Sequence, residues 1–413
     1  HFRQAITGLT RRNPNPYDGE PFYNLGLALK MQGRDADAFD AFYKAVWNAA
    51  WQDAAYFELA RLAARRGAFE EALQLAENAI RRNWSHHKAR HLKIALLRHL
   101  ERIDAALDEA ALALDLDPMD VNVMWEVRRL ADDSLFDEVI TPAPHRFIEV
   151  ALDYLAAGLA DDAIAVLGVA PKTDPMLLYF LAYARLEAGD ASGAAETFAA
   201  AAAMPPDYCF PHRLESVPVL ETAMRLNPAD ARAPYYLGNF WYAHRRYAEA
   251  IACWERARDM DPSFPTTHRN LGLAYFNKLQ DAERAKAAYE RAFSLNPDDA
   301  RVLFELDQLD KRLNRPPGER LARLAAYPRL VERRDDLTIE FITLLNIHGR
   351  HADAYAALMG RRFHPWEGGE GKVAGQYVVS LVEAARALLA DGQPAQAAEL
   401  LEPKVQHVHL SSV

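Results

Sequence analysis

A spacing of 34 residues between side chains at equivalent helix positions recurs along this chain, and it restricts the fold more than any other feature. Gly26, Ala60 and Ile94 follow one another at this interval, and Gly238 and Gly272 repeat it later. A small residue at this position lets the two helices of a hairpin approach closely. Because one hairpin cannot bury its own apolar stripe, neighbouring hairpins must stack. The spacing therefore predicts a continuous helical stack.

The return helix of each hairpin carries its own small residue, as at Ala38, Ala72 and Ala250. Helix-stopping prolines follow several of these helices, at Pro118, Pro228, Pro262 and Pro297. Together these residues resemble the tetratricopeptide repeat family over nearly the whole chain. The resemblance implies an all-α fold, a right-handed α-solenoid of helix hairpins, rather than a set of unrelated helical bundles.

The strength of the repeat signal divides the chain into three predicted regions. Residues 1–143 hold N-terminal repeats, residues 144–230 hold irregular middle repeats, and residues 231–403 hold C-terminal repeats with a Gly-rich loop at 363–372. The first boundary falls at the proline-containing break 141–144. Residues 2–9 are predicted to form a return helix without its partner, so we expect the beginning of the protein to be missing.

Composition narrows the classes of partner. The net charge is −10, half of the residues are hydrophobic and about a quarter are charged, which favours a folded protein and disfavours nucleic-acid binding. No apolar run approaches the ~20 residues of a membrane helix, so no membrane contact is expected. Two cysteines make no disulfide framework and fit a reducing compartment, which predicts a cytoplasmic protein.

The tetratricopeptide resemblance also assigns the concave face of the stack, which the first helix of each hairpin lines. In the first three hairpins the inward residues form a basic and partly aromatic set in an otherwise acidic protein. An acidic peptide or a carboxylate-bearing ligand would suit such a face, and the alternative is an ordinary solvated helix surface. The paired Lys and Asn residues of chaperone-tail clamps are not found. The predicted residues are Tyr23, Phe57, Arg61, Arg65, His91 and Arg98.

A second predicted groove comes from the hairpins at 231–298. It combines aromatic rings with amide and guanidinium groups, which suit a peptide backbone or a sugar. The alternative is that its aromatic residues serve only in packing. The predicted residues are Arg232, Tyr235, Asn239, Tyr242, Arg269, Phe276 and Asn277.

The Gly-rich loop 363–372 is the one stretch that hairpin packing does not require. It is not a phosphate-binding loop, because Val373 stands where a Mg²⁺-binding hydroxyl is needed and no strand precedes it. The alternatives are a contact loop and a long turn between hairpins. For the first, the predicted contact residues are His364, Trp366 and Lys372, and weak candidates for glycoside acid/base chemistry are Glu367 and Glu370.

Residues 205–400 show a second resemblance, carried by residues 235–239, 269–277 and 363–372. They resemble the C-terminal repeat half of bacterial proteins of unknown function that carry an N-terminal aldose-epimerase-like β-sandwich. The resemblance implies a β-rich carbohydrate module upstream of residue 1, against which the repeats would pack.

The function predicted from these features is a non-enzymatic scaffold that binds a protein or peptide segment, or a companion domain, on its concave face. The alternative is the helical module of a carbohydrate-binding or carbohydrate-processing protein, with the 363–372 loop at a sugar site. No nucleophile, zinc-protease or dinucleotide motif supports an enzyme, and no cofactor is expected. His87 and His91 are four residues apart on one helix but lack a further ligand, so no metal is expected.

Overall fold

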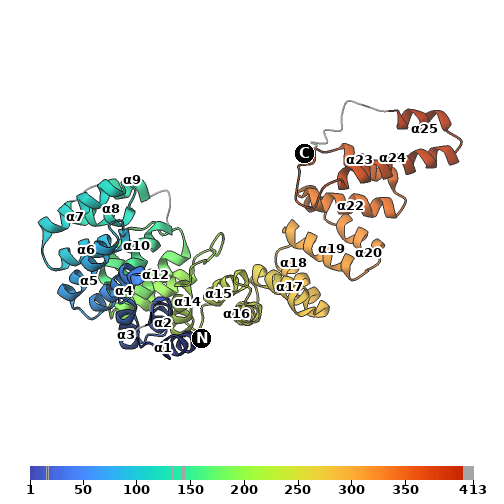
Figure 1. The fold of residues 1–413 in the computed structure, drawn as a ribbon. Helices are drawn as coiled ribbons and strands as arrows, with labels where there is room; N and C mark the ends of the chain where they lie inside the picture. The colour runs from blue at the N-terminus through green and yellow to red at the C-terminus, as the bar shows by residue number, and fades with distance from the viewer. Residues whose placement is uncertain (15, 17, 132–133, 141–144, 403–413) are drawn as a thin grey trace. The chain divides into compact units, whose positions relative to one another are not determined.

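The computed structural model describes residues 1–14, 16, 18–131, 134–140 and 145–402. Every regular element within these ranges is helical, and within each unit most consecutive helices pack as antiparallel hairpins (Figure 1), which confirms the predicted α-solenoid. The chain divides into two compact units, His1–Phe240 (unit 1) and Trp241–Val413 (unit 2). The predicted boundary at residues 143/144 and the predicted end at residue 403 lie outside the described residues.

Unit 1 stacks its hairpins in chain order. Its helices are α1 Phe2–Thr10, α2 Glu20–Lys30, α3 Asp35–Ala45, η1 Ala49–Trp51, α4 Gln52–Arg65, α5 Phe69–Arg82, α6 His87–His99, α7 Ile103–Leu116, α8 Val121–Ala131, α9 Leu135–Ile140, α10 His145–Ala156, α11 Ala160–Val169, α12 Pro175–Glu187, α13 Ala191–Ala202 and α14 Ser216–Leu226. Helix α15, Arg232–Ala243, contains the boundary between the units.

Unit 2 continues the hairpin pattern and adds two short helices between α19 and α22. Its helices are α16 Tyr247–Met260, α17 Pro265–Leu279, α18 Ala282–Leu295, α19 Ala300–Arg312, α20 Pro317–Ala325, α21 Pro328–Glu332, α22 Asp335–Ile347, α23 His351–Met359, α24 Lys372–Ala390 and α25 Pro394–Leu401.

The small residues of the repeat sit where two helices of a hairpin touch. A Cβ atom added to Gly26 would lie 2.6 Å from the ring of Phe42, and one added to Gly272 would lie 2.8 Å from the ring of Tyr289. Both distances are below van der Waals contact, so only glycine allows the aromatic ring of the return helix to approach. The buried Ala38 supplies the matching small residue on the other helix.

Helix α24 is the one described helix that is long and apolar enough to cross a membrane by length and composition alone. A mostly buried core helix can meet the same criterion, but only 11% of this window is buried, although α24 contacts α22, α23 and α25. Within it, Lys372, Glu383 and Arg386 carry charge. The expectation that the chain makes no membrane contact therefore stays a prediction.

Candidate functional site

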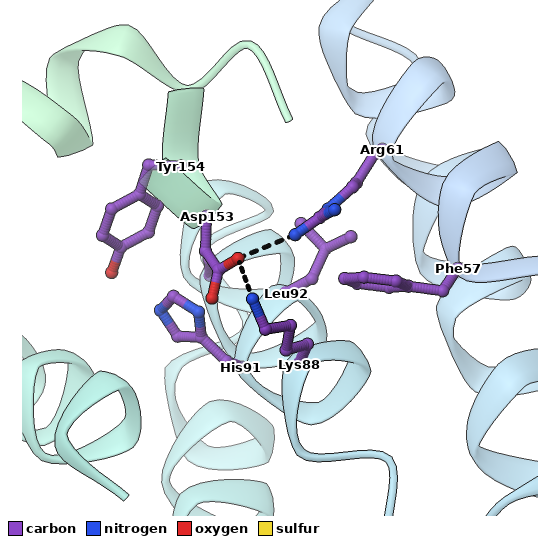
Figure 2. A pocket seen from close by; sticks show the side chains of 8 residues that line it. Phe57, Arg61, Lys88, His91, Leu92, Asp153 and Tyr154 are labelled. Atoms are coloured by element: carbon purple, nitrogen blue, oxygen red, sulfur yellow. Dashed lines mark hydrogen bonds and ion pairs between the residues drawn. The ribbon is translucent and has the colours of Figure 1, made fainter. Parts of the chain in front are cut away.

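A small pocket in unit 1 lies where α4, α6 and α10 meet (Figure 2). It brings together three of the predicted inner-face residues, Phe57, Arg61 and His91. The imidazole of His91 is buried, and its Nε2 has no hydrogen-bond partner among the described residues. The guanidinium of Arg61 lies over the Phe57 ring at 4.1 Å from its centroid. The other lining residues are Lys88, Leu92, Ala95, Asp153 and Tyr154.

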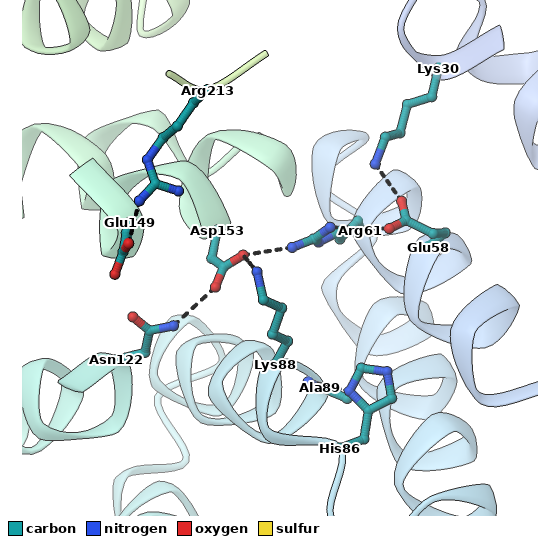
Figure 3. A network of polar contacts seen from close by, with 10 residues as sticks. All are labelled: Lys30, Glu58, Arg61, His86, Lys88, Ala89, Asn122, Glu149, Asp153 and Arg213. Atoms are coloured by element: carbon teal, nitrogen blue, oxygen red, sulfur yellow. Dashed lines mark hydrogen bonds and ion pairs between the residues drawn. The ribbon is translucent and has the colours of Figure 1, made fainter. Parts of the chain in front are cut away.

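Arg61 occupies the centre of a chain of buried charges (Figure 3). It donates to Glu58 Oε1 at 3.1 Å and to Asp153 Oδ1 at 2.7 Å. Lys30, from the preceding inner helix α2, also pairs with Glu58. Burial opposes ionisation of Glu58, but the attraction of Arg61 and Lys30 outweighs it and holds the pKa of Glu58 below its usual value. The positive charge of Arg61 is therefore paired with two carboxylates of the same protein.

Asp153 reaches this network from α10, a helix far along the sequence. Lys88 Nζ donates to Asp153 Oδ1 at 3.0 Å, and Asn122 Nδ2 donates to Asp153 Oδ2 at 2.9 Å (Figure 3). Burial tends to raise the pKa of Asp153, yet Arg61 and Lys88 together hold it below its usual value. Asp153 therefore joins α4, α6, α8 and α10 through one ionised carboxylate.

A second charged cluster surrounds Arg98. Its guanidinium donates to both carboxylate oxygens of the fully buried Glu126, at 2.8 and 3.0 Å, and to Asp162 Oδ1 at 3.1 Å. Asp162 also lies 2.7 Å from His99 Nε2 and pairs with Arg129. Burial opposes ionisation of Asp162, but these neighbours hold its pKa well below the usual range. Arg98 is thus a structural ion-pair partner in this unit.

The two remaining residues of the first predicted set also contact their own chain. Arg65 Nη2 donates to the Leu155 carbonyl at 3.2 Å, and a Cβ atom at Gly158 would lie 2.7 Å from Arg65 Cα. Tyr23 is half-buried, with its ring centroid 4.9 Å from that of Trp51. The α10–α11 hairpin therefore lies against Arg65, and a role for Arg65 and Tyr23 in partner binding stays a prediction.

The acidic partners of these cations were missed by the sequence reasoning, although a signal for some of them was present. A basic residue near the end of one inner helix pairs with a glutamate of the next inner helix, 28 or 29 residues further on. This offset is short enough to be found by scanning the sequence. The pairs are Lys30 with Glu58, Arg98 with Glu126, and Lys311 with Glu340.

The second predicted set of residues is divided between the units. Arg232, Tyr235 and Asn239 belong to unit 1, on α15. Tyr235 is buried, with its ring centroid 5.5 Å from that of Tyr236, so it serves in packing. Tyr242, Arg269, Phe276 and Asn277 belong to unit 2.

Tyr242 is part of an aromatic cluster in unit 2. Its ring centroid lies 5.1 Å from that of Tyr247 and 5.3 Å from that of Trp254. The ammonium of Lys278 lies 4.0 Å from the Tyr247 centroid and 5.9 Å from that of Tyr242. Tyr242 is half-buried, and this burial raises its pKa against the opposing charge of Lys278. The cluster thus places the half-buried rings of Tyr242 and Tyr247 beside the exposed Lys278.

The inner helix α17 combines one satisfied charge with accessible groups. Arg269 Nε donates to Glu305 Oε2 on α19 at 2.9 Å. Phe276 is half-buried, with the guanidinium carbon of Arg312 5.7 Å from its ring centroid. Asn277, the next residue, is exposed. These side chains leave aromatic and amide surface in contact with solvent.

The Gly-rich loop is anchored on the start of α22. Arg361 pairs with Asp335 and donates to Thr338 Oγ1 at 2.6 Å. The backbone N–H of His364 donates to Asp335 Oδ2 at 2.8 Å, and the His364 side chain is 80% exposed. The loop therefore has a defined position on unit 2.

Within the loop, Trp366 packs against the backbone. A Cβ atom at Gly369 would lie 2.3 Å from the Trp366 ring, so this glycine is required for the contact. Glu367 and Glu370 are both exposed, and Glu370 Oε1 accepts from the Gly368 N–H at 3.3 Å. Lys372 is exposed at the first position of α24. Among the described residues no group of three or more His, Cys, Asp or Glu side chains has metal-binding geometry.

Comparison with known proteins identifies the repeats in unit 2. A family model described as TPR repeat matches residues 242–278, and one described as tetratricopeptide repeat matches residues 269–299. The tetratricopeptide repeat protein 37 of Xenopus laevis is 28% identical over 130 residues. That alignment covers 30% of this chain and 8% of the relative, so the chain spans less than a tenth of the relative's length.

Solved structures similar to this chain include helical repeat proteins. The TPR domain of P58(IPK) is 17% identical, with coverage of 91% and 99% of the two chains and a TM-score of 0.30. Yeast Tom70 is 13% identical, with coverage of 92% and 90% and a TM-score of 0.28. MamA from Desulfovibrio magneticus RS-1 is 19% identical, with coverage of 46% and 97% and a TM-score of 0.28. With the hairpin geometry and the two family matches, the chain is a protein that contains tetratricopeptide repeats.

Proposed function

We propose that the chain is a non-enzymatic scaffold that binds an extended segment of a protein partner on the inner face of unit 2. The observation that carries the proposal is the accessible set Tyr242, Phe276 and Asn277 on α15 and α17. The inner-face arginines Arg61 and Arg269 are both paired within the chain, so the groups left in contact with solvent are the aromatic and amide side chains of this set.

The chemistry of the set suits a peptide. The carboxamide of Asn277 can both donate to and accept from a peptide backbone, and the rings of Tyr242 and Phe276 offer apolar contact for side chains. Tetratricopeptide repeats generally act as scaffolds for protein–protein interaction, which supports a protein partner over a small molecule.

The test uses the purified chain to select from a phage-displayed library of random dodecapeptides. We expect the recovered peptides to lose retention about tenfold or more on the double variant Tyr242→Ala/Asn277→Ala. Glu283→Ala, an exposed residue on the outer helix α18, serves as the matched control and should retain them. Equal retention by the double variant and the control would refute the proposal.

A companion domain upstream of residue 1 and a carbohydrate ligand are the remaining candidates for the partner. The exposed carboxylates of Glu367 and Glu370 beside Trp366 favour the second, because sugars bind to an aromatic ring with polar groups at its edge. A glycan array tests it: signal that is lost on Trp366→Ala and kept on Glu283→Ala would support a sugar site. Absence of signal on the glycan array would exclude the sugar site and leave protein binding as the proposed function.

A further inference from the structure

The loop between α13 and α14, residues 203–215, presents large apolar side chains to solvent. Tyr208 is 91% exposed, Phe210 is 67% exposed and Leu214 is 49% exposed. Other rings of unit 1 are exposed too, such as Tyr43 at 57% and Trp47 at 58%, but Tyr208 and Phe210 are more exposed than either and lie within three residues of each other. Exposed aromatic side chains gathered in one place are typical of a protein interaction surface.

The loop is held in place by the residues between the exposed ones. Cys209 and Pro211 are buried, and the Cys209 thiol donates to Asp174 Oδ1, 3.9 Å away at the start of α12. Burial and the Asp174 charge raise the pKa of Cys209 to about 12, so the thiol keeps its proton at neutral pH. Arg213 pairs with Glu149 of α10 (Figure 3). The aromatic residues are therefore displayed on an anchored backbone.

The backbone at Tyr208 is itself strained. Its φ is +59°, in the left-handed region that costs a non-glycine residue about 1–2 kcal/mol. Such a conformation persists only where the surrounding structure imposes it. Here the buried Cys209 follows immediately, so the strain and the anchoring occur at the same point. A loop fixed in this way loses little conformational entropy when a partner binds.

The carboxylates beside the exposed rings indicate the charge of the partner. Asp207 and Glu215 are exposed carboxylates for which the described part of the chain provides no partner. The nearby Arg213 is already paired with Glu149. Arginine and lysine side chains can stack on Tyr and Phe rings and pair with carboxylates at the same time. Anionic membranes and nucleic acids would be repelled by this surface.

We propose that the loop 203–215 is a second docking surface, which binds an arginine- or lysine-bearing segment of a protein partner on Tyr208 and Phe210. Asp207 and Glu215 pair with the cations of that segment. This surface is separate from the inner face of unit 2 and does not depend on the function proposed for it.

The test repeats the dodecapeptide selection with the intact chain and sorts the recovered peptides by the variants that release them. We expect a class enriched in Arg and Lys that loses retention at least tenfold on Tyr208→Ala/Phe210→Ala and on Asp207→Asn/Glu215→Gln. Tyr43→Ala, which removes a tyrosine 57% exposed on α3, is the matched control and should retain this class. Raising the salt concentration should weaken its binding, since exposed charges are screened.

The outcomes separate the two proposed surfaces. Peptides of the basic class should remain bound to the Tyr242→Ala/Asn277→Ala variant. The docking surface is refuted if no recovered peptide depends on the loop, or if loop-dependent peptides lack Arg and Lys enrichment. Since all four altered side chains are exposed, unchanged thermal melting of the loop variants should verify that each one folds.

Discussion

The two units are built from the same hairpins, and both pair cations with glutamates of the next inner helix, but unit 1 adds an ion pair that reaches much further along the chain. In unit 1, Arg61 reaches Asp153, 92 residues further along the chain on α10. In unit 2, Arg269 pairs with Glu305 on α19, the next inner helix in sequence, 36 residues away. The contrast shows that the repeat pattern alone does not decide whether the charges of an inner face are accessible to a partner. In unit 1 the single helix α10 supplies the carboxylate that pairs with Arg61.

The largest expected effect on stability comes from breaking the ion pair between α4 and α10 in unit 1. Asp153→Ala would leave Arg61 without its α10 partner in a site where the two side chains are 11% and 10% exposed. Removing one member of a buried ion pair costs about 3–5 kcal/mol when the other charge is left unpaired. Arg61 keeps Glu58, but Lys88 also loses its contact with Asp153, so we expect a loss near the lower end, about 3 kcal/mol. Hydrogen exchange measured by mass spectrometry should show lower protection in α4 and α10, with α17 and α19 unchanged. Asp108→Ala, at an exposed site on α7, is the control.

The next effect tests what the units share. Gly26→Ala and Gly272→Ala each force a methyl group against an aromatic ring, and overpacking of this kind costs about 1–3 kcal/mol. We expect urea denaturation to show a similar loss for both variants. Gly8→Ala, in α1 with no atom within 4 Å of the added Cβ, should be neutral or slightly stabilising. A loss in only one unit would mean that the hairpins are not packed equivalently.

A smaller effect is expected for the charged pair of unit 2. Arg269→Ala removes hydrogen bonds to Glu305, a residue that Arg301 also contacts at 3.1 Å. The carboxylate keeps a cationic partner, so a loss of about 1–2 kcal/mol is expected. Protection from hydrogen exchange in α19 reports it. A loss as large as that of Asp153→Ala would remove the proposed difference between the units.

The smallest effect is expected from mild acidification. The pKa values of Glu58 and Asp153 are both lowered, so their contribution to stability is complete above the ordinary carboxyl pKa of about 4. Lowering the pH from 7 to 5 should therefore leave the contribution of these two carboxylates unchanged, and in a His86→Asn variant, which removes the separate loss that the lowered pKa of His86 causes in this range, the urea midpoint of unit 1 should stay nearly constant. The stability is lost only as the pH falls below about 4 and through the lowered values. A steep loss between pH 7 and 5 in that variant would contradict this assignment.

The sequence predicted the fold because its main determinant is local. Gly26 and Phe42 lie within one hairpin, and the four stop-signal prolines each follow the last helical residue by two positions, as at Leu116 and Pro118. The ion pair between α4 and α10 was not predictable in the same way. The pairing of Arg61 with Asp153 joins residues 92 positions apart, so no short window of sequence contains both partners.

The candidate site was predicted only as a set of residue types. Three of the predicted inner-face residues, Phe57, Arg61 and His91, line one pocket, and their role in partner binding stays a prediction. The prediction considered only the cations of that face, and so it left out Glu58 and Asp153, whose carboxylates pair with Arg61. The exposed Tyr208 and Phe210 carried no repeat signature, so nothing in the periodicity drew attention to them.

The ion pairs that join successive inner helices have a consequence for rearranging this protein. Lys30 and Glu58, like Lys311 and Glu340, lie on opposite sides of a junction between neighbouring inner helices. A hairpin inserted, deleted or exchanged at such a junction would deprive the glutamate, 6% or 8% exposed, of this lysine unless it carried the matching charge at the same helix position. Designed repeat arrays that keep a lysine and a glutamate at these positions of each junction should therefore fold more readily than arrays whose hairpins are chosen by apolar packing alone.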